Sequence, residues 1–435
     1  MEAPEEKDNG EEILEAQFVA RQPIFDAALQ VWGYELLYRH AGGALTAEIA
    51  DGDTATAKVI ADGVIIGRSG LGPTEKTLIN FPASLLLKGF GFALPPESCI
   101  IEILETVDPT PEVIRALGDL KAAGYTLALD DFVGQPEHEP FLALADIIKV
   151  DMLDTPPDIL PGIASRMRGA GRTLLAEKVE SLDMVERARA MGFSLFQGFF
   201  FCRPEVVKGR KLSSSQVSKL RLLQELADED FDTSKVCKIV ENDLSLSYRL
   251  LRYINSASFG RRDPVEDIHH AIMILGQRNL SKWLQAVVMS DMNPSAKGRE
   301  LVFMSVRRAK FLEALGRKLS RPPVKPDSLF MLGLFSLLDS LLGQSMEDVL
   351  KELPLAPEIV DALQGVHSAS REFLDLAEDL EHADWASAQH FLRTLHLPPA
   401  LASVLNADAL RYAGDIVRDV HVKPPAKPAP RAGRQ

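Results

Sequence analysis

The feature that most constrains this 435-residue sequence is a unit that repeats between residues 18 and 203. Each unit is a short apolar run rich in Val, Ile, Leu and Phe, and most runs are followed by a segment of helical length. Such alternation is typical of folds built from parallel β/α units. The runs lie at residues 18–25, 31–38, 77–81, 99–104, 125–130, 146–151, 172–177 and 193–198. Eight candidate strands favour a TIM-like (β/α)8 barrel.

One strand of this barrel is expected to run antiparallel to the rest. Only residues 26–30 separate the first two runs, a spacing that suits a hairpin but is too short for a parallel crossover. Helices are predicted at residues 53–66, 110–123, 157–170 and 182–191. Gly124, Gly171 and Gly192 are placed to end the last three of these helices.

After Pro204 the strand pattern fades, and the remaining sequence indicates a separate all-helical domain. A basic, Ser-rich stretch at residues 206–216 has the composition of a linker. Helices are expected at residues 216–227, 234–241, 245–256, 264–275 and 280–289, with more to about residue 418. We therefore divide the chain into an acidic tail (1–16), a barrel (17–205), a helical domain (206–421) and a Pro-rich, disordered tail (422–435).

Composition narrows the class of protein. There are 48 Lys and Arg against 62 Asp and Glu, and the net charge of -14 disfavours polymeric nucleic acid as a partner. The most apolar stretch, residues 329–342, is too short for a membrane span and is expected to be a buried helix. Cys99, Cys202 and Cys237 lie far apart without CxxC spacing, which suits reduced thiols. With no signal peptide at the N-terminus, we expect a cytoplasmic protein.

Acidic and amide side chains stand at the ends of the predicted strands. Because the carboxyl ends of barrel strands converge on one mouth, these side chains are expected to gather there. Clustered carboxylates repel one another unless divalent cations join them, and oxygen ligands without nearby Cys or His suit Mg²⁺ or Mn²⁺. The alternative is that each group caps a helix or solvates a loop. The residues are Glu35, Asn80, Glu102, Glu105, Asp130, Asp131, Asp151 and Glu177.

Short motifs follow one another in a fixed order across residues 18–204. They are ARQPIFD (20–26), GYELLYR (33–39), LINF (78–81), EILE (102–105), LDDF (129–132), KVD (149–151), EKVE (177–180) and FQGFFFCRP (196–204). As an ordered set they are specific, and this segment resembles the EAL family of cyclic-di-GMP phosphodiesterases. The resemblance implies hydrolysis of cyclic-di-GMP to linear pGpG by a two-metal mechanism that uses Mg²⁺ or Mn²⁺.

The resemblance also implies a role for each matching side chain. Glu35, Asn80, Glu102 and Asp130 would hold one metal ion, and Asp131 would serve the second. Lys149 and Glu177 would be the catalytic pair, Gln22, Arg39 and Gln197 would bind the substrate, and Glu105 would support a neighbouring loop.

Three segments depart from the family's pattern. The loop at residues 133–140 has Pro136 and Pro140 where the family has small residues. The family's EGVE motif reads EKVE, so Lys178 would either compete with a cation or point outward. Residues 40–53 replace a Pro-rich segment. Three functions stay open: an active phosphodiesterase, a barrel that binds cyclic-di-GMP or metal without efficient turnover, and a non-enzymatic adaptor for a protein partner.

Residues 244–260 and 264–284 resemble the HDOD domain, a relative of HD phosphohydrolases, most distinctively at Asn255-Ser256. HD enzymes require a His-Asp dipeptide, and none of the nine histidines is followed by Asp. His269-His270 are therefore expected on a helix surface or as a core pair. The resemblances imply a bacterial signalling protein with a non-catalytic HDOD output domain that binds an unknown signalling protein, and they also imply a homodimer, since EAL proteins often dimerise.

Overall fold

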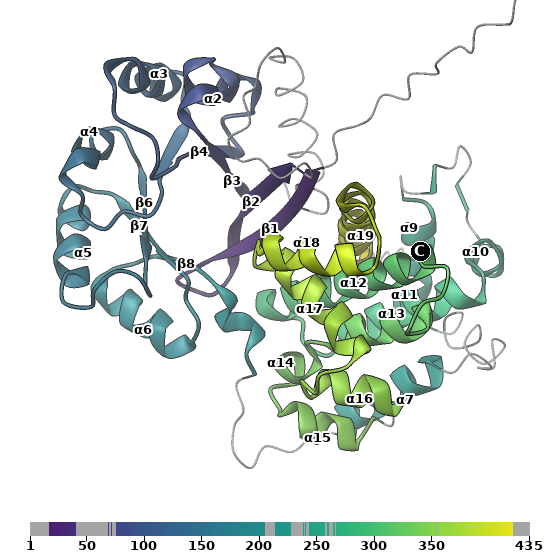
Figure 1. Cartoon of the computed structure of the whole chain (residues 1–435). Coiled ribbons are helices and arrows are strands. Elements are labelled where there is room, and N and C mark those ends of the chain that lie inside the picture. The colour runs from purple at the N-terminus through teal and green to yellow at the C-terminus, as the bar shows by residue number, and fades with distance from the viewer. Residues whose placement is uncertain are drawn as a thin grey trace, which may run out of the picture.

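The computed structural model describes residues 17–40, 68, 71, 75–204, 214–227, 238, 240, 243–256, 259–260, 264–265, 267–353 and 355–420. Several sequence predictions lie outside these residues: the acidic tail, the helix at 53–66, most of the linker and of the helix at 234–241, Cys237 and the Pro-rich tail. The described residues form a β/α barrel with a helical region beside it (Figure 1).

Eight strands close into a barrel in sequence order, which confirms the predicted fold class. β1 pairs antiparallel with β2 and β8, and the other neighbouring strands pair in parallel. The strand that opposes the others is therefore β1. The bounds are β1 (Gln17–Asp26), β2 (Val31–His40), β3 (Lys76–Phe81), β4 (Cys99–Ile103), β5 (Thr126–Leu129), β6 (Ile147–Asp151), β7 (Thr173–Glu177) and β8 (Leu195–Gln197).

Helices connect the strands around the outside of the barrel (Figure 1). Local sequence sets their ends: Thr110 caps α3 by accepting a hydrogen bond from Val113 N, and Gly192 ends α6 with a left-handed φ of 99°. The bounds are α2 (Ala83–Leu87), η1 (Phe90–Ala93), α3 (Pro111–Ala122), η2 (Pro136–His138), α4 (Glu139–Leu142), α5 (Leu160–Gly169), α6 (Leu182–Met191) and η3 (Phe199–Cys202).

A buried apolar layer fills the barrel beneath the strand ends. It consists of Ile24, Leu78, Ile100, Ala128, Ile147, Leu175 and Leu195. Side chains on one face of a strand recur every second residue, so the position two residues further along each parallel strand also points inward. Those positions are Asn80, Glu102, Asp130, Lys149, Glu177 and Gln197. Strand geometry therefore places these polar groups together above an apolar floor.

The C-terminal half is helical throughout its described residues, as predicted. The long helix α12 lies at its centre, with α13 and α19 packed against it. No helix in the described part of the chain is long and apolar enough to cross a membrane. The bounds are α7 (Ser214–Ala227), α9 (Leu244–Ile254), α10 (Ile268–Leu275), α11 (Gln277–Ser290), α12 (Ala296–Lys318), α13 (Pro326–Phe335), α14 (Leu338–Leu342), α15 (Met346–Lys351), α16 (Pro357–Leu363), α17 (Ala369–Glu381), α18 (Trp385–Thr394) and α19 (Pro399–Val420).

The apolar stretch at residues 329–342 is buried, but the prediction of one helix was wrong. It comprises most of α13, a turn at residues 336–337, and α14. The Ser336 hydroxyl donates to Gly333 O at 2.8 Å and accepts a hydrogen bond from Arg308 Nη1 at 3.1 Å. A serine that bonds its own helix in this way favours a bend, and the buried Arg308 holds the hydroxyl in place.

The helix expected at residues 264–275 begins only at Ile268. Asn255 holds Val265 outside the helix, because Val265 N donates to Asn255 Oδ1 at 2.7 Å and Asn255 Nδ2 donates to Val265 O at 2.8 Å. The distinctive Asn255 thus has a structural role in the helical region. His269 and His270 lie on the exposed side of α10.

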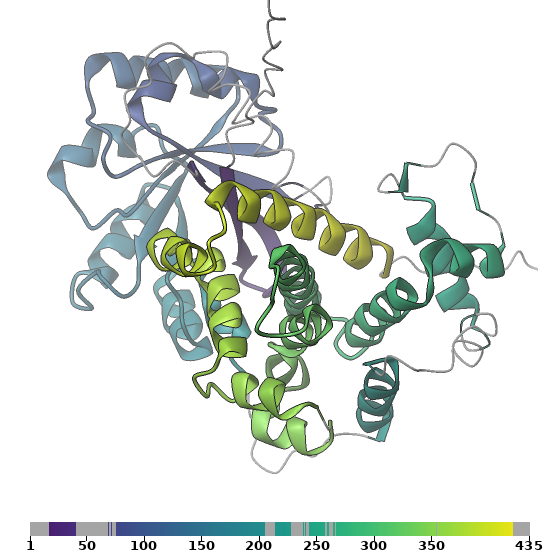
Figure 2. The same ribbon diagram turned by 45° about the vertical axis from the view of Figure 1, so that its right-hand side comes forward.

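The helical region covers the outer side of the β1–β2 hairpin, with α17 and α19 packed against β1 (Figure 2). The Arg21 guanidinium lies 4.3 Å from the ring centroid of Tyr34 and 3.8 Å from that of Phe303 on α12. Tyr34 also donates a hydrogen bond to Glu300 Oε2 at 2.9 Å. Buried polar and cation–π contacts therefore join the two halves.

Candidate functional site

Five carboxylates from the strand ends gather at this mouth of the barrel, and we call them the carboxylate ring: Glu35, Glu102, Asp130, Asp131 and Glu177. Lys149 lies at its centre, and its side chain is only 1% exposed. Lys149 Nζ lies 3.2 Å from Glu35 Oε2 and 2.8 Å from both Asp130 Oδ1 and Glu177 Oε1, and it also contacts Glu102 Oε1. The structure thus brings together residues that are up to 142 positions apart in the sequence.

The ring perturbs the protonation of its members. Burial opposes the charged form of Lys149, but the surrounding carboxylates outweigh it and raise the pKa well above the usual value. Burial, together with the charge of Glu35, raises the pKa of Glu102. Burial is also the main cause that raises the pKa of Glu177 to about 8. Lys149 is therefore held protonated, while Glu177 exchanges a proton near neutral pH.

Two amide side chains fix the orientation of Glu35. Asn80 Nδ2 donates to Glu35 Oε1 at 3.2 Å, and Gln197 Nε2 donates to Glu35 Oε2 at 2.7 Å. Gln197 Nε2 also donates to Gln22 Oε1 at 2.9 Å. Gln22 and Gln197, predicted as substrate contacts, therefore lie beside the carboxylate ring.

Several buried oxygens of the site have no hydrogen-bond partner among the described residues: Asn80 Oδ1, Glu102 Oε2, Glu177 Oε2 and Gln197 Oε1. All are acceptors, and a buried acceptor without a partner is costly. Asp130, Asp131 and Glu177 also each offer one oxygen within 4.8 Å of the others. An all-oxygen set of this kind fits a hard divalent cation such as Mg²⁺ or Mn²⁺.

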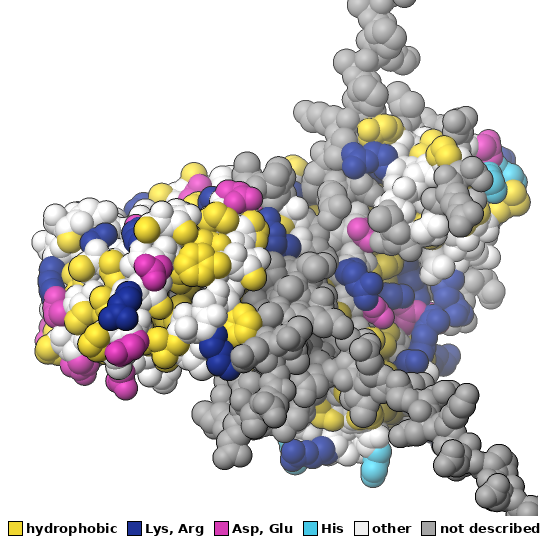
Figure 3. All heavy atoms as spheres, turned by 90° about the horizontal axis from the view of Figure 1, so that it is seen from above, with side chains coloured by type: hydrophobic (Ala, Val, Ile, Leu, Met, Phe, Trp, Pro, Cys, Tyr) yellow, Lys and Arg dark blue, Asp and Glu magenta, His cyan; other side chains and the backbone are white. Residues whose placement is uncertain are grey.

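The charge of the ring supports the same fit. Its five carboxylates, four of which contact Lys149, leave a formal charge of four negative units together with that lysine when all are ionised. Two divalent cations would balance that charge. The outer surface differs, since the barrel face in Figure 3 shows acidic and basic side chains interspersed with apolar ones.

The loop after Asp131, where the sequence departs from the EAL pattern, is folded. Asp131 has a left-handed φ of 42°, and Gln135 Nε2 donates to the carbonyl of Asp131 at 3.2 Å. The chain then forms η2 and α4, in which the ring centroids of the buried His138 and of Phe141 are 5.9 Å apart. Burial and the neighbouring Asp130 raise the pKa of Asp131. The loop thus leaves Asp131 in the carboxylate ring despite its unusual sequence.

Lys178 forms its ion pairs outside the ring, although its charge also acts on Asp131, a ring member. It pairs with Asp151 and with Asp154, the latter at 3.1 Å, and its side chain is 51% exposed. Burial would raise the pKa of Asp151, but hydrogen bonds from Lys178 and from backbone N–H groups lower it. Asp151 therefore belongs to this outer pair. Lys178 itself has a left-handed φ of 50°, a conformation that a glycine adopts more readily.

Besides Asp151, two more predicted site residues are not placed in the ring. Glu105 is exposed, two residues beyond the end of β4. The side chain of Arg39 lies outside the described residues. Sequence reasoning also missed a contact from the helical region, where Gln22 Nε2 donates to the backbone carbonyl of Glu381 at 3.3 Å. A backbone carbonyl carries no sequence signal, so only the structure shows this contact.

Comparisons with known proteins agree with this architecture. The sequence profile of the EAL domain matches residues 83–204, and that of the HDOD domain matches residues 213–356. Glu35 and Asn80 precede the matched EAL segment.

Two curated relatives match most of the chain. Cyclic di-GMP phosphodiesterase CdgJ of Vibrio cholerae serotype O1 is 35% identical over 395 residues, covering 89% of this chain and 90% of the relative. The uncharacterized protein YuxH of Bacillus subtilis (strain 168) is 36% identical over 400 residues, covering 90% of this chain and 97% of the relative.

Solved structures with some similarity include two EAL proteins. An EAL domain protein from Listeria monocytogenes is 24% identical, with a TM-score of 0.36, over 43% of this chain and 88% of that chain. Klebsiella pneumoniae BlrP1, in a complex with calcium and cyclic-di-GMP, is 27% identical, with a TM-score of 0.35, over 43% of this chain and 56% of that chain. From the extent and identity of the curated matches, the chain belongs to the family of proteins that join an EAL domain to an HDOD domain.

Proposed function

We propose that this protein is a cyclic-di-GMP signalling protein whose barrel hydrolyses cyclic-di-GMP to linear pGpG. The observation that carries the proposal is the convergence of Glu35, Glu102, Asp130 and Glu177 on Lys149, with acceptor oxygens left over for cations. The name of the relative CdgJ supports the choice of substrate.

Two divalent cations, when bound, would supply a nucleophilic water at neutral pH and polarise the scissile phosphate. The residues suited to hold them are Glu35, Asn80, Glu102 and Asp130 for one ion and Asp131 for the other. Lys149 stays protonated and presents a fixed positive charge to an anionic oxygen. Glu177, whose Oε1 lies 2.8 Å from Lys149 Nζ, is placed to accept a proton in the site. Gln22, Arg39 and Gln197 orient the nucleotide.

A second candidate is a barrel that binds cyclic-di-GMP without turnover and acts as an adaptor. The observation that favours it is the position of Lys149, whose Nζ contacts four carboxylates and so competes with a cation for their oxygens. The folded loop of η2 and α4 adds a second departure from the EAL pattern beside Asp131.

Chromatography of the product separates the two candidates. Full-length protein is incubated with cyclic-di-GMP and either Mn²⁺ or Mg²⁺, and pGpG is quantified. We expect metal-dependent conversion that is lost in Glu35→Gln, while Glu97→Gln, an exposed carboxylate before β4, converts at the wild-type rate. Calorimetric binding of cyclic-di-GMP without any conversion under either metal would reject hydrolysis and favour the adaptor.

For the helical region we propose a non-catalytic output role. In the described residues the group of acidic side chains able to hold a metal lies in the barrel, and His269 and His270 are exposed on α10. We expect a His269→Ala, His270→Ala double variant to bind a signalling partner as the wild type does, which affinity capture from the source organism would check. Retained capture would support the output role. A homodimeric mass by light scattering would support the homodimer expected from the sequence.

A further inference from the structure

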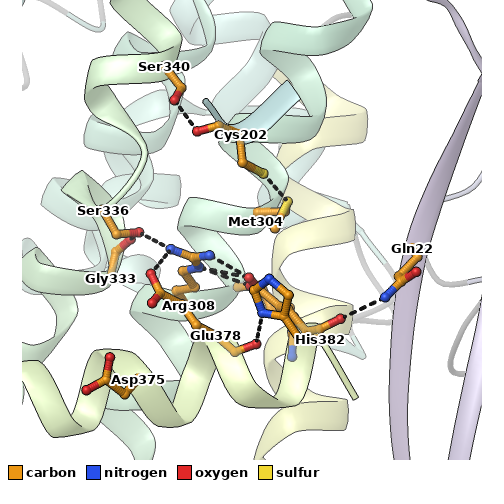
Figure 4. Close-up of polar contacts among 12 residues, drawn as sticks. Gln22, Cys202, Met304, Arg308, Gly333, Ser336, Ser340, Asp375, Glu378 and His382 are labelled. Carbon is orange, nitrogen blue, oxygen red and sulfur yellow. Dashed lines mark hydrogen bonds and ion pairs between the residues drawn. The ribbon is translucent and has the colours of Figure 1, made fainter. Parts of the chain in front are cut away.

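The C-terminal end of α17 reaches the barrel on both sides of Gln197. On one side, Gln22 points from β1 toward the end of α17 and donates to the carbonyl of Glu381 at 3.3 Å (Figure 4). On the other side, the ring of His382 lies 4.0 Å, between centroids, from the ring of Phe199, two residues after Gln197. The helical region therefore contacts Gln22, which bonds Gln197, and Phe199, which follows Gln197 by two residues. Gln197 itself bonds the carboxylate ring.

The first contact dictates the orientation of two amides. A backbone carbonyl can only accept a hydrogen bond, so Gln22 must turn its N–H₂ group toward Glu381 and its Oε1 toward Gln197. Gln197 must then present Nε2 to Gln22, and the same nitrogen donates to Glu35 Oε2 at 2.7 Å. A flip of either amide would set two acceptors against each other. We call this chain of contacts, from Glu381 O through Gln22 and Gln197 to Glu35, the amide relay.

The origin of the relay is held rigidly. The Glu381 carboxylate accepts from Arg307 Nη1 at 3.1 Å and from Arg308 Nε at 3.0 Å, and all three side chains are at most 5% exposed. Arg308 also bonds Glu378 and Ser336, so it ties the end of α17 to α12 and to the α13–α14 turn. Figure 4 shows Arg308 at the centre of these contacts. Because the guanidinium engages the carboxylate at two points, it fixes the position as well as the charge.

We propose that the C-terminal turn of α17, held by Arg308, is a positioning element for the cation site of the barrel and acts through the amide relay on Glu35. The inference rests on the cation-binding part of the proposed function. Arg308 does not contact the carboxylate ring. It positions Glu381, whose carbonyl keeps the donor groups of Gln22 and Gln197 directed so that Glu35 is preoriented for a metal ion.

A double-mutant cycle tests this coupling in the full-length protein. The dissociation constant of Mn²⁺ is measured by electron paramagnetic resonance for wild type, Arg308→Lys, Gln22→Ala and the double variant. Lysine keeps the positive charge beside Glu381 but loses the two-point contact. Outer partners of metal ligands typically alter metal affinity by about 10- to 100-fold. We expect Arg308→Lys to weaken Mn²⁺ binding by about tenfold, at the low end of that range, in the wild-type background and to have no further effect in Gln22→Ala.

Arg371→Lys is the matched control, because Arg371 lies on α17, the helix of Glu381, and bonds Asp375 and Glu378 rather than Glu381. It is expected to leave Mn²⁺ affinity unchanged. If Arg308→Lys fails to give a wild-type melting curve, His382→Ala replaces it, with the exposed His390→Ala on α18 as its control.

Equal Mn²⁺ affinities for Arg308→Lys and Arg371→Lys would overturn the inference, as would an Arg308→Lys effect that persists in full in Gln22→Ala. Hydrolysis of cyclic-di-GMP is measured on the same samples. If the double-mutant cycle shows the expected coupling but cyclic-di-GMP is not hydrolysed, the proposed activity alone is rejected. If cyclic-di-GMP is hydrolysed but Arg308 and Gln22 are not coupled, the positioning role alone is rejected. Failure of the wild type to bind Mn²⁺ would reject both.

Discussion

Replacing Lys149 with Met tests the physical basis of the carboxylate ring. Methionine has a similar length, so it fills the space but removes the only cation that contacts Glu35, Glu102, Asp130 and Glu177 in the described structure. Removing one partner of a buried ion pair costs about 3–5 kcal/mol, because it leaves buried charge uncompensated. For a unit of 150–250 residues, that corresponds to a fall in Tm of about 6–20 °C.

The loss of stability is expected to depend on pH. Carboxylates whose folded pKa is raised, such as Glu102 and Glu177, hold protons in the folded state that the unfolded chain releases at lower pH. Stability therefore falls as pH rises from the unfolded pKa to the folded one. Without Lys149 these pKa values rise further, so the stability deficit of Lys149→Met is small at pH 5 and largest at pH 8.

Thermal melting by circular dichroism, without metal and then with saturating Mn²⁺, measures the effect. We expect Mn²⁺ to restore much of the lost Tm, because binding to the folded state adds stability and a cation replaces the missing charge. Lys121→Met is the control, since Lys121 pairs with Asp146 at side-chain exposures of 33% and 34%, where ion pairs contribute about 0–1 kcal/mol. If the Tm of Lys149→Met without metal were as high as the Tm of Lys121→Met, the reasoning would be refuted.

Three further outcomes are expected. Gly198→Ala should destabilise the protein by about 1–3 kcal/mol in urea titration, because Gly198 has φ 144° and a Cβ would lie 2.2 Å from the carbonyl oxygen of Val179. Gly118→Ala is the control and should not destabilise it, because a Cβ on Gly118 in α3 would meet no atom within 4 Å. Mn²⁺ affinity, followed by calorimetry, should rise with pH up to about 8 as Glu177 loses its proton, and a flat profile would contradict the raised pKa. Lys178→Gly should change Mn²⁺ affinity little, since its ammonium pairs with Asp151 and Asp154 outside the carboxylate ring and acts on Asp131 through its charge alone, and markedly tighter binding would show instead that it competes with the cation.

Much of the barrel was predictable because strand periodicity is a local property of the chain. Every predicted strand is present, and the short link at residues 26–30 correctly indicated that one strand runs antiparallel to the rest, which the pairing with β2 and β8 identifies as β1. The same period of two places the ring members Glu102, Asp130 and Glu177 above an apolar floor. Asp151 and Glu105, which were expected beside them, lie outside the ring.

The helical half was less accurately predicted, because long-range contacts set several of its helix ends. The helix expected over residues 329–342 is interrupted at Ser336, which Arg308 contacts from another helix. The late start of α10 depends on Asn255, which lies 10 residues before Val265.

The sequence by itself determined which groups point into the barrel, since side-chain direction along a strand depends only on backbone geometry. The tertiary structure decided what those groups meet. Lys178 follows a ring member directly, yet a left-handed backbone turns it to the outer side. Gln22 meets Glu381, 359 residues away, through a backbone carbonyl that every residue type carries. Contacts of this kind depend on how two folded units pack, and no local pattern in the chain encodes them.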